Sequence, residues 1–245
     1  MLELEHISYR VSDSEGDVDI LRDVSLTIPD HKLVVFTGPN GGGKTTLAKV
    51  MAGIIAPDEG QVIFNGEDIT KLDVTERARK GIAFAFQQPV RFKGLTVKAL
   101  LDIAGGGNTS MCDYLSQVGL CARDYLYREI NQTLSGGEMK RIEIATVLAR
   151  RAPLSIFDEP EAGIDIWSFA GLIKTFDSMR KAPEGTLVIV SHQERILSIA
   201  DEIVLLDAGC IAAQGSVESV LPQLVSGGMA QKVCDRKERA INERA

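Results

Sequence analysis

The chain has 245 residues, of which 44% are hydrophobic and 25% charged, a composition typical of one soluble globular domain. Its formal net charge is -7, from 27 basic and 34 acidic residues. Nucleic-acid binders usually need a basic face, so we expect no nucleic-acid partner unless basic residues cluster. The first residues alternate apolar and polar side chains, unlike a signal peptide, and no window approaches the roughly 18 apolar residues of a membrane span. We therefore expect a cytoplasmic protein without direct membrane insertion.

The N-terminal part has the pattern of antiparallel β structure. Leu2, Leu4 and His6 alternate with residues of the opposite face, and a polar loop over 12–19 precedes a second strand over 20–28. An apolar run over 33–36 then has the composition of a strand buried in a central sheet.

Apolar runs and helical patterns alternate through the rest of the chain, which favours an α/β fold with a mixed, largely parallel sheet. Further strands are predicted at 61–64, 82–86, 154–157, 187–190 and 203–206, and helices at 44–53, 138–150, 166–180 and 193–200. The N-terminal strands form an antiparallel β layer at one edge of this core.

The pattern changes between Gln87 and Thr133, where strand signals stop and a glycine-rich break separates two short helical segments. We therefore assign one domain over 1–245. It has a core over 1–86 and 150–225, a small helical subdomain over 87–149, and a tail over 226–245 that is an exposed helix or a frayed end.

A phosphate-binding loop follows the strand at 33–36. The segment fits G-x-x-x-x-G-K-[ST] and precedes a predicted helix, the context in which backbone N–H groups and the helix N-terminus bind phosphate. Lys44 would reach the β- and γ-phosphates, Thr45 would help to hold Mg²⁺, and Thr46 would contact the α-phosphate side. The residues of this ATP-binding loop are Gly38, Pro39, Asn40, Gly41, Gly42, Gly43, Lys44, Thr45 and Thr46.

Two acidic residues end the apolar strand at 154–157. Charges at the end of a buried strand are costly unless they have a function. Asp158 is predicted to bind Mg²⁺, and Glu159 to act as the general base that polarises the attacking water. The two residues predict the second half of a nucleoside triphosphatase site.

Leu134-Ser135-Gly136-Gly137-Glu138 resembles the LSGGE signature of the ABC ATPase family. In that family the signature of one subunit contacts the nucleotide on the phosphate loop of the other. The resemblance covers nearly the whole chain and implies a P-loop core, ATP and Mg²⁺ as ligands, and ATP-dependent homodimerisation. A similar segment over 224–229 lacks the following acidic residue, and we interpret it as a loop.

Other family positions match one by one. Gln87 matches the Q-loop glutamine that senses Mg²⁺ and the partner, whereas Gln88 is a weaker candidate. Asp165 lies in the segment that matches the D-loop, which crosses the dimer interface, and His192 matches the switch histidine that contacts the γ-phosphate. The resemblance leaves the adenine contact open between Tyr9 and the region of Val11.

The biological role of the predicted ATPase is inferred from a further resemblance. Four segments resemble the SufC ATPases of the SUF iron–sulphur cluster assembly system, namely 84–90, 135–144, 158–166 and 191–197. They imply a SufB/SufD-like scaffold as the partner. Pro160, common in transporters, and a short insertion before the signature indicate a compact relative. The alternative is the cytosolic ATPase subunit of an ABC membrane transporter.

Four cysteines bear on the cluster-assembly hypothesis. Their spacing fits neither a zinc site nor a disulfide framework, so we interpret them as reduced thiols and expect no cluster ligand among them. They are Cys112, Cys121, Cys210 and Cys234.

Overall fold

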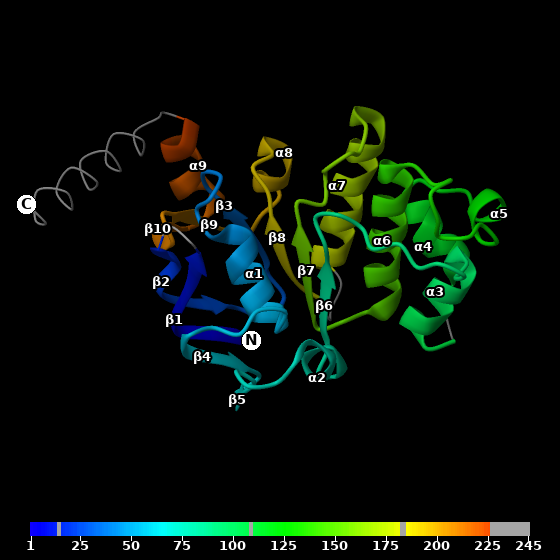
Figure 1. The fold of residues 1–245 in the computed structure, drawn as a ribbon. Helices are drawn as coiled ribbons and strands as arrows, with labels where there is room; N and C mark the ends of the chain where they lie inside the picture. The colour runs from blue at the N-terminus through cyan, green and yellow to red at the C-terminus, as the bar shows by residue number, and fades with distance from the viewer. Residues whose placement is uncertain (14–15, 108–109, 182–184, 226–245) are drawn as a thin grey trace, which may run out of the picture.

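The computed structural model describes residues 1–13, 16–107, 110–181 and 185–225. Its strands form two sheets (Figure 1). The larger has six strands in the order β10-β9-β3-β8-β7-β6, parallel except for β10, which runs antiparallel to β9. The smaller is the antiparallel sheet β2-β1-β4-β5. The predicted α/β class with a mixed sheet and an added β layer is confirmed.

The β layer begins with a long hairpin. Its strands are β1 (Leu2–Asp13), β2 (Gly16–Ile28), β4 (Glu59–Phe64) and β5 (Glu67–Asp68). Pairing of Arg10 with Asp19 and of Ser12 with Asp17 takes strand structure into the predicted loop at 12–19, so that expectation was wrong.

The predicted alternation in β1 breaks at His6. Its φ of 54° lies in the left-handed region, and the pairing register shifts between Leu4 and Ile7. The irregularity exposes His6 and buries Ile7 fully against the core. The alternation holds only up to this bulge, because one extra residue moves every following side chain to the other face.

The larger sheet separates two apolar clusters. Along β3, Val34 and Phe36 belong to one cluster and Leu33 and Val35 to the other, because successive side chains point to opposite faces. The strands of this sheet are β3 (Leu33–Thr37), β6 (Ile82–Ala85), β7 (Leu154–Asp158), β8 (Thr186–Val190), β9 (Glu202–Asp207) and β10 (Cys210–Gly215).

Helix α1 (Lys44–Ala52) packs between the larger sheet and the β layer, and α6 (Gly136–Arg150) and α7 (Ile166–Lys181) cover the other face (Figure 1). Helices α2 (Val74–Arg79) and α9 (Val217–Val225) were not predicted. Helix α8 (Glu194–Leu197) is a single turn, shorter than the predicted helix over 193–200.

The region between β6 and α6 is helical, as expected. It contains α3 (Val97–Gly105), α4 (Met111–Gln117) and the short α5 (Ala122–Tyr125), where two helices were predicted. Both α3 and α4 contact α6. In the described residues, no helix combines the length and the apolar character that a bilayer span requires.

The C-terminal predictions have mixed outcomes. The first two positions of the segment 224–229, interpreted as a loop, belong to α9 instead. The remainder of that segment and the predicted tail over 226–245 lie outside the described residues.

Candidate nucleotide-binding site

The predicted phosphate loop connects β3 to α1. Gly38 has φ 134°, and a Cβ atom there would lie 2.0 Å from the carbonyl oxygen of Leu206 on β9, so only glycine fits. Gly43, at φ 96°, turns the chain directly into Lys44, the first residue of α1. The loop therefore ends at a helix N-terminus, the arrangement that binds phosphate groups.

Lys44 lies across this loop. It is buried, and its Nζ donates hydrogen bonds to the carbonyl oxygens of Gly38 and Pro39, at 2.8 Å each. Burial lowers the pKa of Lys44, and the nearby carboxylates of Glu159 and Asp158 act against that shift. A buried cation held by carbonyl oxygens at the start of α1 suits an anionic ligand.

Thr45 and Asp158 meet at the end of the sheet. The Thr45 hydroxyl donates to Oδ1 of Asp158 at 2.9 Å, although the residues are 113 positions apart. Asp158 is 1% exposed, and burial raises its pKa. A hydroxyl and a carboxylate with converging oxygens are ligands that suit Mg²⁺.

Glu159 and Gln87 also meet, as Nε2 of Gln87 donates to Oε2 of Glu159 at 2.7 Å. Glu159 has φ 43°, in the left-handed region that non-glycine residues seldom adopt. Its N–H donates to the carbonyl oxygen of Val190, two residues before His192. Strained backbone of this kind concentrates at functional sites. The structure thus brings the ends of β6, β7 and β8 together beside the phosphate loop.

The signature residues lie elsewhere. Ser135 is the N-cap of α6, followed by Gly136 and Gly137. A Cβ atom on Gly137 would lie 2.8 Å from the carbonyl oxygen of Gly163, so this turn packs against the predicted D-loop. Asp165 caps the start of α7, accepting the N–H groups of Trp167 and Ser168. Helices α1 and α6 pack on opposite faces of the larger sheet, so the phosphate loop and the predicted signature turn each begin a helix on a different side of it.

A capping box fixes the signature turn. The N–H of Glu138 donates to Oγ of Ser135 at 3.2 Å, and the N–H of Ser135 donates to Oε2 of Glu138 at 2.7 Å. Glu138 also accepts hydrogen bonds from Tyr125 and Arg128. Tyr125, followed by the Ser135 N–H, lowers the pKa of Glu138 to about 2.

We predict that Glu138→Ala lowers the free energy of unfolding by about 1 kcal/mol, the usual loss for a helix cap. Glu138→Gln, which keeps an acceptor oxygen, is the control and should lose less. Because the folded-state pKa lies below the unfolded value, the contribution of Glu138 is present above about pH 4.5 and declines towards pH 2. Urea denaturation at pH 7 and pH 3 measures both effects. Equal stability of the wild type and the alanine variant at pH 7 would contradict the prediction.

Two residues that the site prediction did not include hold the start of the predicted Q-loop. The Glu143 carboxylate accepts the N–H of Phe86 at 2.9 Å, and the fully buried Lys140 donates to the carbonyl oxygen of the same residue. Lys140 and Glu143 form an ion pair at 3.2 Å. The sequence signal that could have identified them is a lysine and a glutamate three positions apart on a helix face that is otherwise apolar.

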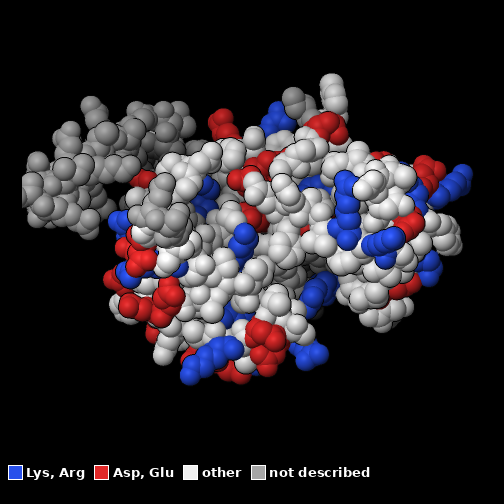
Figure 2. Space-filling view, viewed as in Figure 1, with Lys and Arg blue, Asp and Glu red and all other residues white. Residues whose placement is uncertain are grey.

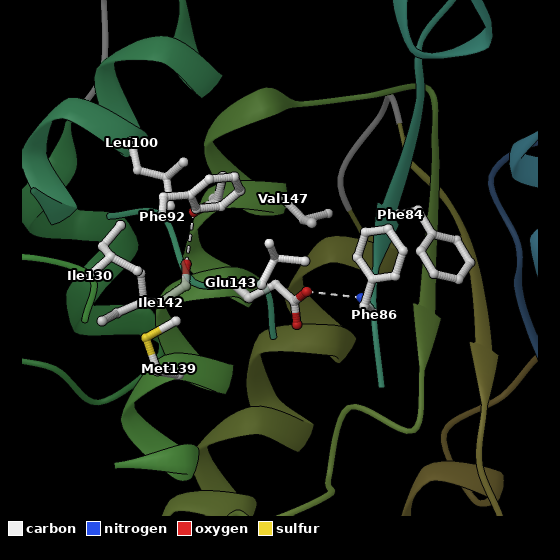
Figure 3. A pocket seen from close by; sticks show the side chains of 11 residues that line it. Phe84, Phe86, Phe92, Leu100, Ile130, Met139, Ile142, Glu143 and Val147 are labelled. Atoms are coloured by element: carbon white, nitrogen blue, oxygen red, sulfur yellow. Dashed lines mark hydrogen bonds between the residues drawn. The ribbon is translucent and has the colours of Figure 1, made fainter. Parts of the chain in front are cut away.

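A groove of about 160 Å³ opens between the end of β6 and α6 (Figure 3). It is lined by Phe84, Phe86, Val90, Phe92, Leu100, Ile130, Met139, Ile142, Glu143, Thr146 and Val147. Val90 and Phe92 are 46% and 40% exposed. Arg91 and Lys93, on either side of Phe92, are exposed. Acidic and basic side chains are interspersed on the face shown in Figure 2.

The adenine contact remains a prediction. Tyr9 is half-buried against the core of the β layer, and Val11 is 41% exposed. The register shifts before and after Tyr9, so simple alternation does not decide the face of either side chain.

The described cysteines are free thiols. Cys112 and Cys121 are exposed and Cys210 is half-buried. Within the described ranges no group of three or more potential ligands of the His, Cys, Asp or Glu type could hold a metal ion. Cys234 lies outside the described residues.

Comparisons with known proteins agree with this geometry. The chain shares 37% identity over 84% of its length with an uncharacterised ABC transporter ATP-binding protein of Methanocaldococcus jannaschii, covering 86% of it. It shares 33% identity over 82% of its length with the Haemophilus influenzae lipopolysaccharide export ATP-binding protein LptB, covering 86% of it. A bacterial ABC transporter cassette solved as a dimer has the same fold, with a TM-score of 0.80 at 22% identity over 89% of this chain and 99% of that one. The ABC transporter family model matches residues 21–162. The chain therefore belongs to the ABC transporter family of ATP-binding proteins.

Proposed function

We propose that this chain is the ATP-hydrolysing subunit of an ABC transporter complex and acts from the cytosolic side through a separate membrane partner. The observation that carries the ATPase part is the convergence of Lys44, Thr45 and Asp158 with the Gln87–Glu159 pair. The transporter part is supported by two relatives, one described as an ABC transporter ATP-binding protein and the other as the ATP-binding protein of a lipopolysaccharide export system.

The roles within the site follow from its contacts. Lys44 and the loop 38–43 bind the phosphates of ATP. Thr45, Asp158 and Gln87 would hold Mg²⁺, which neutralises the charge on the phosphates when it is bound. Glu159 orients and deprotonates the attacking water, and His192 contacts the γ-phosphate.

A complete site requires two chains. Ser135, Gly136 and Gly137 offer a second helix N-terminus to an anion, and this element lies on the opposite face of the sheet from α1. The half-sites are best completed by a head-to-tail homodimer in which Ser135–Glu138 and Asp165 of one copy contact ATP bound by the other. ATP then favours closure, and hydrolysis favours opening.

The partner binds the groove between β6 and α6. Nine of its eleven lining residues are apolar, and the groove ends at Phe86, next to Gln87. An apolar side chain of the partner buried there would contact β6, which leads to Gln87 and its hydrogen bond with Glu159. This placement lets the partner respond to closure of the dimer.

Co-purification tests the proposal. The tagged chain, isolated from its source with detergent-solubilised membranes, should retain a protein with several membrane spans, and ATP hydrolysis should rise in that complex. Recovery of a soluble scaffold in place of a membrane protein would contradict the transporter assignment and leave the ATPase assignment standing.

Assembly of iron–sulphur clusters on a SufB/SufD-like scaffold is the second candidate. The candidate is supported by Lys140 and Glu143, two residues on which that resemblance rests, because they bind the backbone carbonyl oxygen and N–H of Phe86 at the groove. A soluble partner that binds iron and sulphide would favour this candidate.

We predict that Phe92→Asp lowers recovery of the partner at least tenfold, because it puts a charge into an apolar groove at a cost of roughly 2 kcal/mol or more. Val74→Asp, at an exposed apolar position on α2, is the matched control and should retain the partner. Equal recovery with both variants would place the partner elsewhere. Quantitative pull-down with each tagged variant makes the comparison.

A further inference from the structure

The carboxylate of Glu161 has no role in the site described above, although it lies between the candidate base and the D-loop. It belongs to a tight turn in which the N–H of Ala162 bonds to the carbonyl oxygen of Glu159, and the N–H of Ile164 to that of Glu161. This turn carries Gly163 against the signature helix and leads into Asp165. A movement of the Glu161 backbone would therefore also move Glu159 and the D-loop.

One oxygen of Glu161 holds the switch loop. Oε1 accepts the hydroxyl of the fully buried Ser191 at 2.5 Å, and Oγ of Ser191 accepts the N–H of Gln193 at 3.0 Å. Both neighbours of His192 are thus tied to one carboxylate, while His192 itself is exposed. The arrangement fixes the backbone on both sides of the imidazole ring.

The second oxygen, Oε2, is buried and has no hydrogen-bond donor within the described residues. Burial raises the pKa of Glu161, whereas the Ser191 hydrogen bond and the nearby His192 lower it, and Glu159 raises it further. An ionised carboxylate offers two acceptor oxygens, and leaving one of them without a donor is costly. His192 follows Ser191 directly in the chain and lies close enough to Glu161 to lower the pKa of its carboxyl.

We propose that Glu161 is a positioning residue for His192, whose imidazole N–H it accepts through Oε2 while Oε1 holds Ser191. An imidazole has two distinct nitrogens, and the hydrogen bond made by one sets the state and direction of the other. With one nitrogen held by Glu161, the other faces the γ-phosphate. The inference rests on the proposed contact of His192 with ATP, and it adds the carboxylate of Glu161 to those of Asp158 and Glu159.

Glu161→Gln is the decisive variant. It is close in shape and keeps an oxygen that can accept from Ser191, but it places an amide N–H₂ donor at Oε2. We expect kcat to fall at least about tenfold with the ATP dissociation constant within about twofold of wild type. Glu194→Gln, which removes an exposed carboxylate two residues after His192, is the matched control and should retain kcat.

A double-mutant cycle separates positioning from folding. In a His192→Ala background, adding Glu161→Gln should change the residual single-turnover rate by less than about twofold, because the interaction is already lost. Wild-type kcat in Glu161→Gln would overturn the inference. So would equal fold-losses in both backgrounds, or a lowered Tm together with weaker ATP binding, which would mark a merely structural role. These three results leave the proposed ATPase function standing, whereas absence of hydrolysis by the wild type, alone and in its complex, would overturn both.

Discussion

Glu159→Gln is expected to lower the rate of ATP hydrolysis by at least about 100-fold while ATP binding persists. The amide has the size of the carboxylate and can still accept from Nε2 of Gln87, which lies 2.7 Å from Oε2 of Glu159. It cannot take a proton from water. Binding without hydrolysis should therefore trap the closed dimer.

Two measurements check this result, namely phosphate release and the mass of the particle by light scattering with and without MgATP. Glu67→Gln, an exposed carboxylate on β5 that pairs with Lys80, is the control for loss of a negative charge. It should hydrolyse ATP as the wild type does. Wild-type hydrolysis by Glu159→Gln would remove Glu159 as the base.

Two inactive variants are expected to complement each other when mixed. Lys44→Ala lacks the phosphate-binding cation, and Ser135→Arg places a bulky side chain at an exposed signature position. A mixed dimer contains one intact phosphate loop opposite one intact signature. If subunits pair at random, half of the dimers are mixed, and each has one working site, so about a quarter of wild-type activity should return.

This complementation tests the composite site directly. Each variant alone should show less than a few per cent of wild-type hydrolysis, since both sites of its homodimer are defective. A mixture of Lys44→Ala with Glu159→Gln, which both damage the phosphate-loop half, is the control and should stay inactive. Failure of the first mixture to exceed the sum of its parts, together with no ATP-dependent dimer, would contradict the head-to-tail arrangement.

Local signals were sufficient for most of the core. The glycine-rich loop predicted the β3–α1 connection because glycine tolerates φ of 134° at residue 38, where a Cβ atom would overlap a backbone oxygen. The function of the acidic pair at the end of β7 could also be predicted, because charged side chains at the end of a buried apolar strand are costly unless they bind a ligand.

Other features depended on distant contacts. The bulge at His6 requires a partner strand, and no local pattern marks it. The hydrogen bonds of Lys140 and Glu143 to Phe86 join residues more than 50 positions apart in the sequence. The hydrogen bond between Ser191 and Glu161 joins residues 30 positions apart. Such pairs become visible only when strands of the parallel sheet come side by side.

The sequence by itself determined that a phosphate loop, an acid pair and an LSGGE segment occur in the order of an ABC ATPase, because each motif is short and its chemistry is local. Tertiary structure alone decided that α1 and α6 pack on opposite faces of one sheet. It also placed the apolar groove beside Phe86, and among the described residues it left one buried oxygen of Glu161 without a donor. Burial and hydrogen-bond partners depend on which segments meet in space, so the groove beside β6 and the buried carboxylate of Glu161 emerge only from the fold.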